Sequence, residues 1–215
     1  MVRVAAVGTA STGKSALLNA LFGTGFPVDA RAGSTSSPIR AFANFEGREL
    51  EVIDTPPLDP HRVPVDADVF LLVCDKDLTY AEYAEALRAS RAGRPLLCAL
   101  NKADTYSDVQ RRQLLSHVGK RLHGLVAARR IVTCAADPVR IADEVQPDGR
   151  VVERLTPARR QVEEILPVLH EVIEEARTSL RVQTRDYARA AAGRVRSAAS
   201  SGWRKLRDRR RDRGT

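Results

Sequence analysis

Eight residues near the start of the chain have the types and the spacing needed to bind a phosphate chain. They run from position 8 to position 15 and read GTASTGKS, a glycine followed after four residues by Gly-Lys-Ser. Successive backbone N–H groups of such a loop surround a phosphate, and the following helix adds the positive end of its dipole. Lys14 can reach the β- and γ-phosphates, and the Ser15 hydroxyl can ligate Mg²⁺. We therefore predict a nucleoside triphosphate site with magnesium as a cofactor.

Two further groups of polar residues indicate which nucleotide the site prefers. Asp54 follows a short β-type run, where a carboxylate can hold a water of the Mg²⁺ shell. Asn101, Lys102 and Asp104 follow an apolar run. The Asp104 carboxylate can accept hydrogen bonds from guanine N1 and N2, Asn101 can meet a purine acceptor, and the Lys102 stem can cover the base. Each group alone is typical of a turn or a helix cap, but together they predict a guanine nucleotide.

Apolar runs alternate with helical patterns along the first 136 residues, and this alternation predicts an α/β fold. It implies a mostly parallel six-stranded sheet flanked by helices, with ligands bound beyond the carboxyl ends of the strands. Every motif described above follows such an end. The predicted strands are residues 2–7, 39–45, 50–53, 69–73, 95–100 and 131–134, and the predicted helices are residues 14–22, 80–92 and 108–123.

The rest of the chain predicts an insertion and a helical extension. Residues 138–157 are polar, with two runs flanking Gln-Pro-Asp-Gly, and favour a hairpin insertion. From Ala158 the pattern is helical, with an apolar stripe wide enough to cover a sheet face. Pro167 is awkward inside that helix because it removes an N–H group. We expect a nucleotide-binding domain over residues 1–176 and a basic helical tail over residues 177–215.

The positive charge of the chain is concentrated in this tail. The formal net charge is +8, and Arg177–Arg213 contain 13 Lys and Arg against 3 Asp. Arginines recur there every four residues, and Trp203 belongs to a group of apolar residues that accompanies the basic ones. A basic amphipathic helix of this kind is typical of an anchor at an anionic membrane surface. It also suits RNA contact, a protein partner or a solvated extension, and these alternatives stay open.

The sequence also indicates the cellular compartment in which we expect the protein. No apolar run approaches the roughly 18 residues that a membrane-spanning helix needs, and no signal segment precedes the first strand. Cys74, Cys98 and Cys134 each end an apolar run, and their spacing fits no zinc pattern. We expect reduced, buried thiols in a cytoplasmic protein, with peripheral membrane contact as an alternative for the tail.

Residues 2–136 resemble the translation-factor-related P-loop GTPases, in particular the Era-like and dynamin-like branch. The resemblance rests on the phosphate loop, on Asp54 as the second-switch aspartate, and on the guanine motif that begins at Asn101. It implies that Thr35 is the first-switch threonine, which ligates Mg²⁺ when GTP is bound. It also implies that a backbone N–H near Ala135 meets guanine O6. Ser11 occupies the position that holds Asn or Ser in potassium-assisted relatives, so K⁺ is a candidate second cofactor.

The resemblance therefore defines a candidate site. Its metal ligands would be Ser15, Thr35 and Asp54, and its catalytic residues Lys14 and Thr35. The residues expected to bind GTP or GDP are Gly8, Ser11, Thr12, Gly13, Lys14, Ser15, Ala16, Asn101, Lys102, Asp104, Cys134 and Ala135.

Two residues depart from the family pattern in the second switch. The family reads Asp-x-x-Gly there and the glycine N–H binds the γ-phosphate, whereas this chain has Pro57, which carries no N–H. The next residue, Leu58, cannot polarise water as the glutamine of Ras-type enzymes does, although Era-like relatives also carry apolar residues there. The sequence shows no obvious arginine finger, since Arg31 and Arg40 near the first switch are typical of solvated charges.

Two functional hypotheses remain open at this point. The first is a GTP-binding switch with slow, Mg²⁺-dependent hydrolysis, activated by a partner protein or by a homodimer. The second is a scaffold that binds guanine nucleotides without hydrolysing them and works through its tail. A charge-assisted hydrogen bond is worth about 1.5–3 kcal/mol, so its loss at Pro57 weakens the preference for GTP without abolishing binding.

Overall fold

The computed structural model describes residues 1–28, 37–59, 65–146 and 150–186. The chain divides into a compact unit, Met1–Ala176, and a second unit, Arg177–Thr215. In the second unit only residues 177–186 are described, and they are helical. The predicted tail beyond them, with Trp203, lies outside the described residues, as does Thr35.

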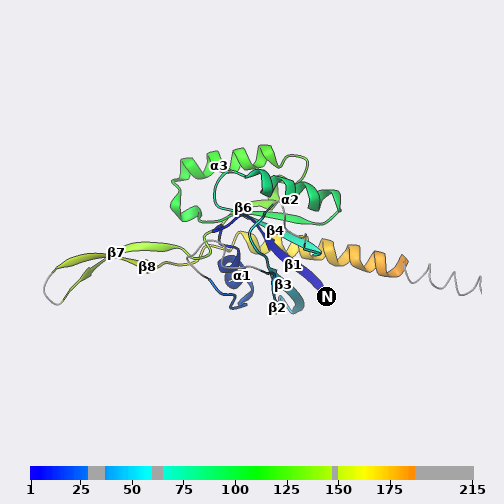
Figure 1. Cartoon of the computed structure of the whole chain (residues 1–215), viewed down its shortest axis with the longest axis horizontal. Helices are drawn as coiled ribbons and strands as arrows, with labels where there is room; N and C mark the ends of the chain where they lie inside the picture. Colours follow the sequence, from blue (N-terminus) through cyan, green and yellow to red (C-terminus); the bar gives the residue numbers. More distant parts are fainter. Residues whose placement is uncertain (29–36, 60–64, 147–149, 187–215) are drawn as a thin grey trace, which may run out of the picture. The chain divides into compact units, whose positions relative to one another are not determined.

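The first unit is built on a six-stranded sheet, which Figure 1 shows with all of its strands except β5 labelled. The strand order is β2-β3-β1-β4-β5-β6, and every neighbouring pair is parallel except β2 and β3. The prediction of a mostly parallel six-stranded α/β fold is therefore confirmed. The strands are β1 (Val2–Val7), β2 (Ile39–Phe45), β3 (Arg48–Asp54), β4 (Val69–Cys74), β5 (Leu96–Leu100) and β6 (Ile131–Thr133).

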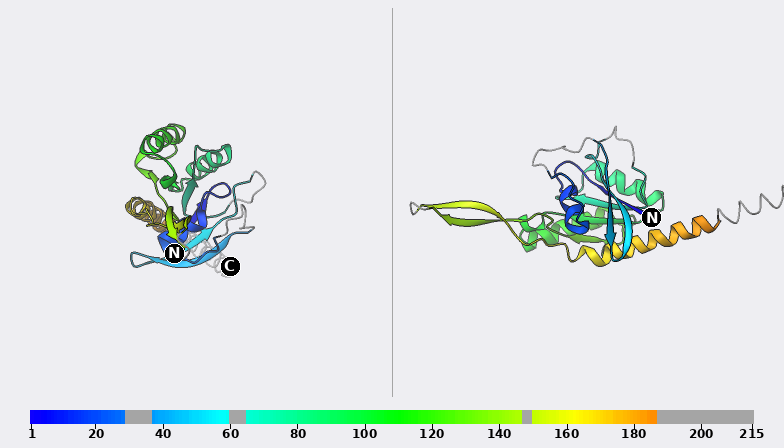
Figure 2. Two further views of the ribbon diagram at one scale, coloured as in Figure 1. Left: turned by 90° about the vertical axis from the view of Figure 1, so that its left-hand side faces the viewer. Right: turned by 90° about the horizontal axis from the view of Figure 1, so that it is seen from below.

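Helices cover both faces of this sheet (Figures 1 and 2). The chain moves across the sheet in one direction from β1 to β3 and in the other from β4 through β5 to β6. Right-handed crossovers therefore put α1 (Lys14–Phe22) on one face, and α2 (Tyr80–Arg91) and α3 (Asp108–Arg121) on the other. Short 3₁₀ turns, η1 (Ala103–Thr105) and η2 (Ala128–Arg130), precede α3 and β6.

The core forms because the central strands are apolar on both faces. Every residue of β4 and β5 is buried, as parallel strands between two helical layers require. On the α2 and α3 side, Ala86, Ala89 and Val118 pack with Phe70 and Leu72 of β4. The other helical layer buries Leu17, Leu18, Ile165, Leu169, Val172 and Ile173.

The chain after β6 differs from the expected helix over its first seven residues. Residues 158–164 are not helical, and Gln161 instead forms an antiparallel bridge with Ala135. The helix begins at residue 165, so Pro167 lies in its first turn, where a backbone N–H has no helical partner to lose. The position that seemed awkward in sequence is therefore an ordinary one for proline.

A hairpin occupies the segment between β6 and this helix. Strands β7 (Val139–Val145) and β8 (Val151–Pro157) pair antiparallel, and the described side chains of β8 are exposed except that of Thr156. The second run was predicted over residues 150–155. The observed strand begins one residue later, at Val151, and ends at Pro157. Residues 147–149 of its turn lie outside the described ranges.

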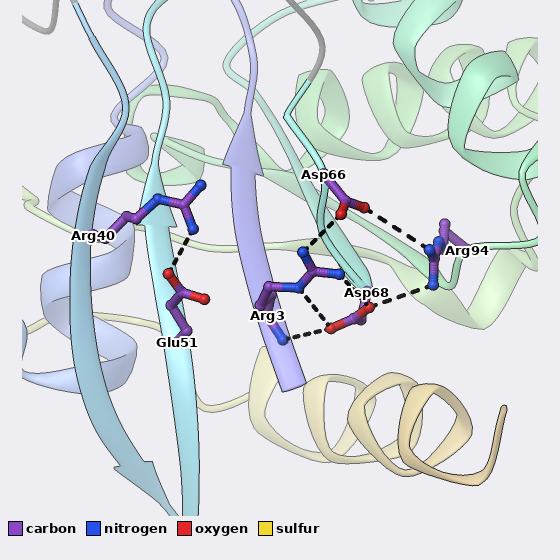
Figure 3. Close-up of polar contacts among 6 residues, drawn as sticks. All are labelled: Arg3, Arg40, Glu51, Asp66, Asp68 and Arg94. Carbon is purple, nitrogen blue, oxygen red and sulfur yellow. Dashed lines mark hydrogen bonds and ion pairs between the residues drawn. The ribbon is translucent and has the colours of Figure 1, made fainter. Parts of the chain in front are cut away.

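An ion-pair cluster joins the amino ends of three strands, at the edge opposite the motifs (Figure 3). The Arg3 guanidinium donates to both carboxylate oxygens of Asp68 and to Asp66, and Arg94 donates to Asp68. Arg3 is the second residue of β1, Asp68 precedes β4 and Arg94 precedes β5. The hydrogen bond from Arg3 holds the pKa of Asp66 below its usual range. The cluster thus fixes the register of the central strands.

The helix that begins at residue 165 makes a second ionic contact that should be visible in acid. Arg129 and Arg130 donate to Glu171 and lower its pKa to about 2. A folded-state pKa below the unfolded value stabilises the fold above about pH 4.5, and this contribution is lost as the pH falls towards 2. Glu171→Gln should therefore destabilise the protein at pH 7 more than at pH 3, in urea unfolding followed by circular dichroism.

Glu49→Gln is the matched control, because Glu49 is an exposed residue of β3 for which the described structure shows no ion pair. A Glu171→Gln effect of the same size at both pH values would contradict the prediction.

Candidate nucleotide-binding site

The phosphate loop lies between β1 and α1, and its two glycines are required by close contacts. A Cβ at Gly8 would lie 2.1 Å from the Val73 carbonyl oxygen, because β1 and β4 approach closely at this point. Gly13 has φ of +86°, and a Cβ there would lie 2.3 Å from the side-chain nitrogen of Asn101. The glycines of the motif therefore serve packing as well as backbone conformation.

Lys14 lies against the loop that it follows. Its Nζ donates to the carbonyl oxygens of Gly8 at 3.1 Å and Thr9 at 3.0 Å, and the side chain is largely buried. Thr12, also buried, donates its hydroxyl to the Thr9 carbonyl. The ammonium group is thus held at the loop, where a bound phosphate chain would meet it. Ala16, two residues after Lys14, lies in the first turn of α1.

Ser15 and Asp54 meet at the end of β3, although 39 residues separate them. The Ser15 hydroxyl donates to a carboxylate oxygen of Asp54 at 2.6 Å, and Asp54 is fully buried. A hydroxyl beside one carboxylate fits Mg²⁺, which prefers oxygen ligands and usually takes only one or two carboxylates alongside substrate phosphates. The third predicted ligand, Thr35, lies outside the described residues.

Asn101 connects the phosphate loop to the far end of the sheet. Its side-chain NH₂ donates to the Thr12 carbonyl at 2.9 Å, and its oxygen accepts the Ala136 N–H at 3.0 Å. The side chain is 2% exposed. Both described bonds are to the backbone, and since the NH₂ group has a second N–H, the expected contact with a purine acceptor stays a prediction. Sequence reasoning did not find this bridge.

Lys102 directly precedes η1, and Asp104 lies within it. Lys102 has a positive φ of 57° and donates from Nζ to the Ser11 carbonyl and to Asp75 at 3.0 Å. Ser11 itself has φ of 60°, and Asp104 is exposed. The lysine stem thus extends along the outside of the phosphate loop, where a base could lie against it.

Asp75 is a site residue that the sequence analysis missed. It directly follows β4, and its carboxylate receives Lys102 while its backbone oxygen accepts the Tyr106 hydroxyl at 2.6 Å. Burial, followed by the Asp75 charge, raises the pKa of Tyr106. A polar residue directly after an apolar run of the sequence was the available signal, since Asp54 and Asn101 also follow such runs.

The Thr-Cys-Ala-Ala segment closes the site after β6. The Cys134 N–H continues the sheet to the Leu100 carbonyl, and burial raises the pKa of its thiol to about 12. The Ala135 N–H donates to the Gln161 carbonyl at 2.9 Å. A guanine O6 would therefore compete with Gln161 for that amide proton, and the predicted contact at Ala135 stays a prediction.

The second switch begins against the phosphate loop. The Leu58 N–H donates to the Gly8 carbonyl at 3.0 Å, and the Leu58 side chain packs on the core. Since Pro57 has no N–H, it lacks the γ-phosphate donor that the resemblance implies at this position. The next amide is already bonded to the loop.

Comparisons with known proteins support the same motifs. Residues 3–102 match the family described as 50S ribosome-binding GTPase. The chain is also 30% identical over 165 residues to the tRNA modification GTPase MnmE of Halorhodospira halophila. That alignment covers 63% of this chain but 34% of the relative, so the chain spans about a third of its length.

Two solved structures of Era share the fold. One is a variant from Aquifex aeolicus bound to GDP·AlF₄⁻, and the other is a complex with MgGDPNP and nucleotides 1506–1542 of 16S ribosomal RNA. Each aligns with a TM-score of 0.52 and 23% identity, over 63% of this chain and 51% of the Era chain.

The family match begins inside β1 and ends at Lys102. It therefore spans the phosphate loop, the Ser15–Asp54 pair and Asn101, which bonds the phosphate loop to the segment after β6. The chain has the P-loop GTPase fold, and its first half is similar to the 50S ribosome-binding GTPase family.

Proposed function

We propose that this protein is a molecular switch that binds GTP and GDP with Mg²⁺ and hydrolyses GTP slowly. The observation that carries the proposal is the bridge through Asn101, which joins the phosphate loop to the segments expected to hold guanine. One side chain thereby couples recognition of the base to the shape of the phosphate site. A nucleotide with a base other than guanine would not engage this bridge.

Each residue has a defined part in this proposal. Lys14 neutralises charge on the β- and γ-phosphates, while Ser15 and Asp54 hold Mg²⁺ directly or through water. When bound, Mg²⁺ supplies further neutralisation of the phosphate oxygens. Asp104 selects guanine through its exposed carboxylate. Thr35 would complete the metal site from the first switch.

Slow hydrolysis follows from the second switch. Pro57 offers no N–H to the γ-phosphate and Leu58 offers no polar atom to orient water. One missing charge-assisted hydrogen bond, worth about 1.5–3 kcal/mol, changes a rate or an affinity about ten- to hundredfold. The same feature favours a second candidate, a scaffold that binds guanine nucleotides without hydrolysing them. Slow reaction also suits activation by a partner protein or a homodimer.

Phosphate release separates the two candidates. Purified protein with GTP and Mg²⁺ should release phosphate slowly but above a Lys14→Ala control, and ATP should give no release above that control. Repeating the assay in KCl and in NaCl tests the K⁺ expectation for Ser11. A rate per molecule that rises with protein concentration would indicate a homodimer. Release no faster than the Lys14→Ala control would favour the scaffold, and equal use of ATP would overturn the guanine assignment.

Restoring the missing amide should restore discrimination between GTP and GDP. Pro57→Ala and Pro57→Gly both supply an N–H at the family position. We expect either variant to raise the affinity for a non-hydrolysable GTP analogue over GDP by about tenfold, measured by calorimetry. Pro56→Ala is the matched control, because it frees the neighbouring backbone without adding a donor at that position. An equal shift in the control would mean that flexibility is the cause.

The basic tail suggests an anionic partner for the switch. Among its described residues, Arg177, Arg181 and Arg185 recur along one face of the helix. The related Era complex contains 16S ribosomal RNA, and a membrane surface offers the same phosphate chemistry.

Binding to anionic liposomes and to RNA should be compared across a salt series. An electrostatic contact with either partner should weaken steeply between 50 and roughly 200 mM salt. A blue shift of Trp203 fluorescence with liposomes, but not with RNA, would identify insertion into the lipid. Binding of neither, at any salt concentration, would leave a protein partner or a solvated tail.

A further inference from the structure

Glu82 is a buried carboxylate that none of the nucleotide-binding motifs includes. It is the third residue of α2 and is 1% exposed. Glutamates are almost never fully buried unless their charge is compensated. A glutamate that only capped its helix could keep one oxygen in water, so this degree of burial requires a further explanation.

The two carboxylate oxygens of Glu82 have different partners. One oxygen accepts the N–H and the hydroxyl of Thr79, at 2.8 and 2.9 Å, and so completes the capping box of α2. The other accepts the N–H of Thr9 at 3.2 Å and its hydroxyl at 2.7 Å. Thr9 lies 73 positions earlier, as the second residue of the phosphate loop. Half of the carboxylate thus serves the helix and half serves the loop.

Thr9 transmits this contact to the phosphate site. Its carbonyl oxygen accepts the Lys14 ammonium at 3.0 Å and the Thr12 hydroxyl at 3.1 Å. The backbone and side-chain donors of Thr9 therefore face Glu82, while its acceptor faces Lys14. Moving Thr9 would move the carbonyl that holds the lysine.

We propose that Glu82 is a positioning residue, which sets the shape of the phosphate loop through Thr9. The inference rests on the proposed binding of guanine nucleotides. Two bonds to each oxygen require a carboxylate, because glutamine would turn an NH₂ group towards the donors of either Thr9 or Thr79. The negative charge of Glu82 opposes a bound phosphate, so an electrostatic role and a positioning role predict changes of opposite sign in nucleotide affinity.

That difference in sign gives the test. The Kd values of fluorescent GDP and GTP analogues should be measured with the full chain for the native protein and for Glu82→Gln. If the contact positions the loop, both Kd values should rise about tenfold, as one unsatisfied buried donor would cause. If only charge matters, both should fall, and this result would overturn the proposal. Glu85→Gln, one turn further along α2, is the matched control, because Glu85 pairs only with Arg88 in the described structure.

Two more variants separate loop positioning from helix capping. Thr79→Val removes a hydroxyl on the capping side and should lower the melting temperature while leaving both Kd values within about twofold. Thr9→Val keeps the N–H and the side-chain size but removes the hydroxyl. It should weaken the binding of both nucleotides by itself, even if Glu82→Gln does not fold. In the double variant, the effects of Thr9→Val and Glu82→Gln should be less than additive.

Independent effects, or equal loss of affinity in Thr79→Val, would show that Glu82 acts only on stability. If the native protein binds no guanine nucleotide, the proposed function fails. If it binds and the Thr9 and Glu82 variants match it, only this inference fails.

Discussion

The side-chain amide of Asn101 joins three backbone segments that are far apart in the sequence. It lies after β5, donates to the phosphate loop after β1, and accepts from the segment after β6. Such a bridge stabilises only if all of its bonds form together, because a buried amide with a missing partner costs about 1–3 kcal/mol. Gly13 is glycine partly because Asn101 occupies the space where a Cβ would lie. The phosphate and base sides of the site thus share one constraint.

The amino and carboxyl edges of the sheet, where the strands begin and end, carry different polar groups. At the amino edge, Arg3, Asp68 and Arg94 connect β1, β4 and β5 through charge, away from any motif (Figure 3). At the carboxyl edge lie the polar groups of the candidate site, among them Asp54 and Asn101. Since parallel strands fix which ends lie together, holding one edge also holds the other in register. The ion pairs at the amino edge therefore also support the arrangement of the residues at the carboxyl edge.

Much of the fold could be predicted from sequence, because apolar strand runs, phosphate-loop spacing and turn residues are local signals. The start of the last helix could not, because Gln161 is recruited by Ala135 into a bridge that depends on tertiary contact. Residues of the candidate site could be named from the sequence where they belong to a motif of known spacing that follows an apolar run. Glu82 was missed because its Thr-x-x-Glu pattern indicates only a helix cap, and its second partner, Thr9, is found only in three dimensions.

The bond from the Leu58 amide to the Gly8 carbonyl bears on what another molecule could sense. The start of the second switch is thus bonded to the phosphate loop itself, and Pro57 has no N–H that could bond to a terminal phosphate. A partner that contacts residues 57 and 58 would therefore contact a segment bonded to the phosphate loop, so its binding would depend on the conformation of that loop.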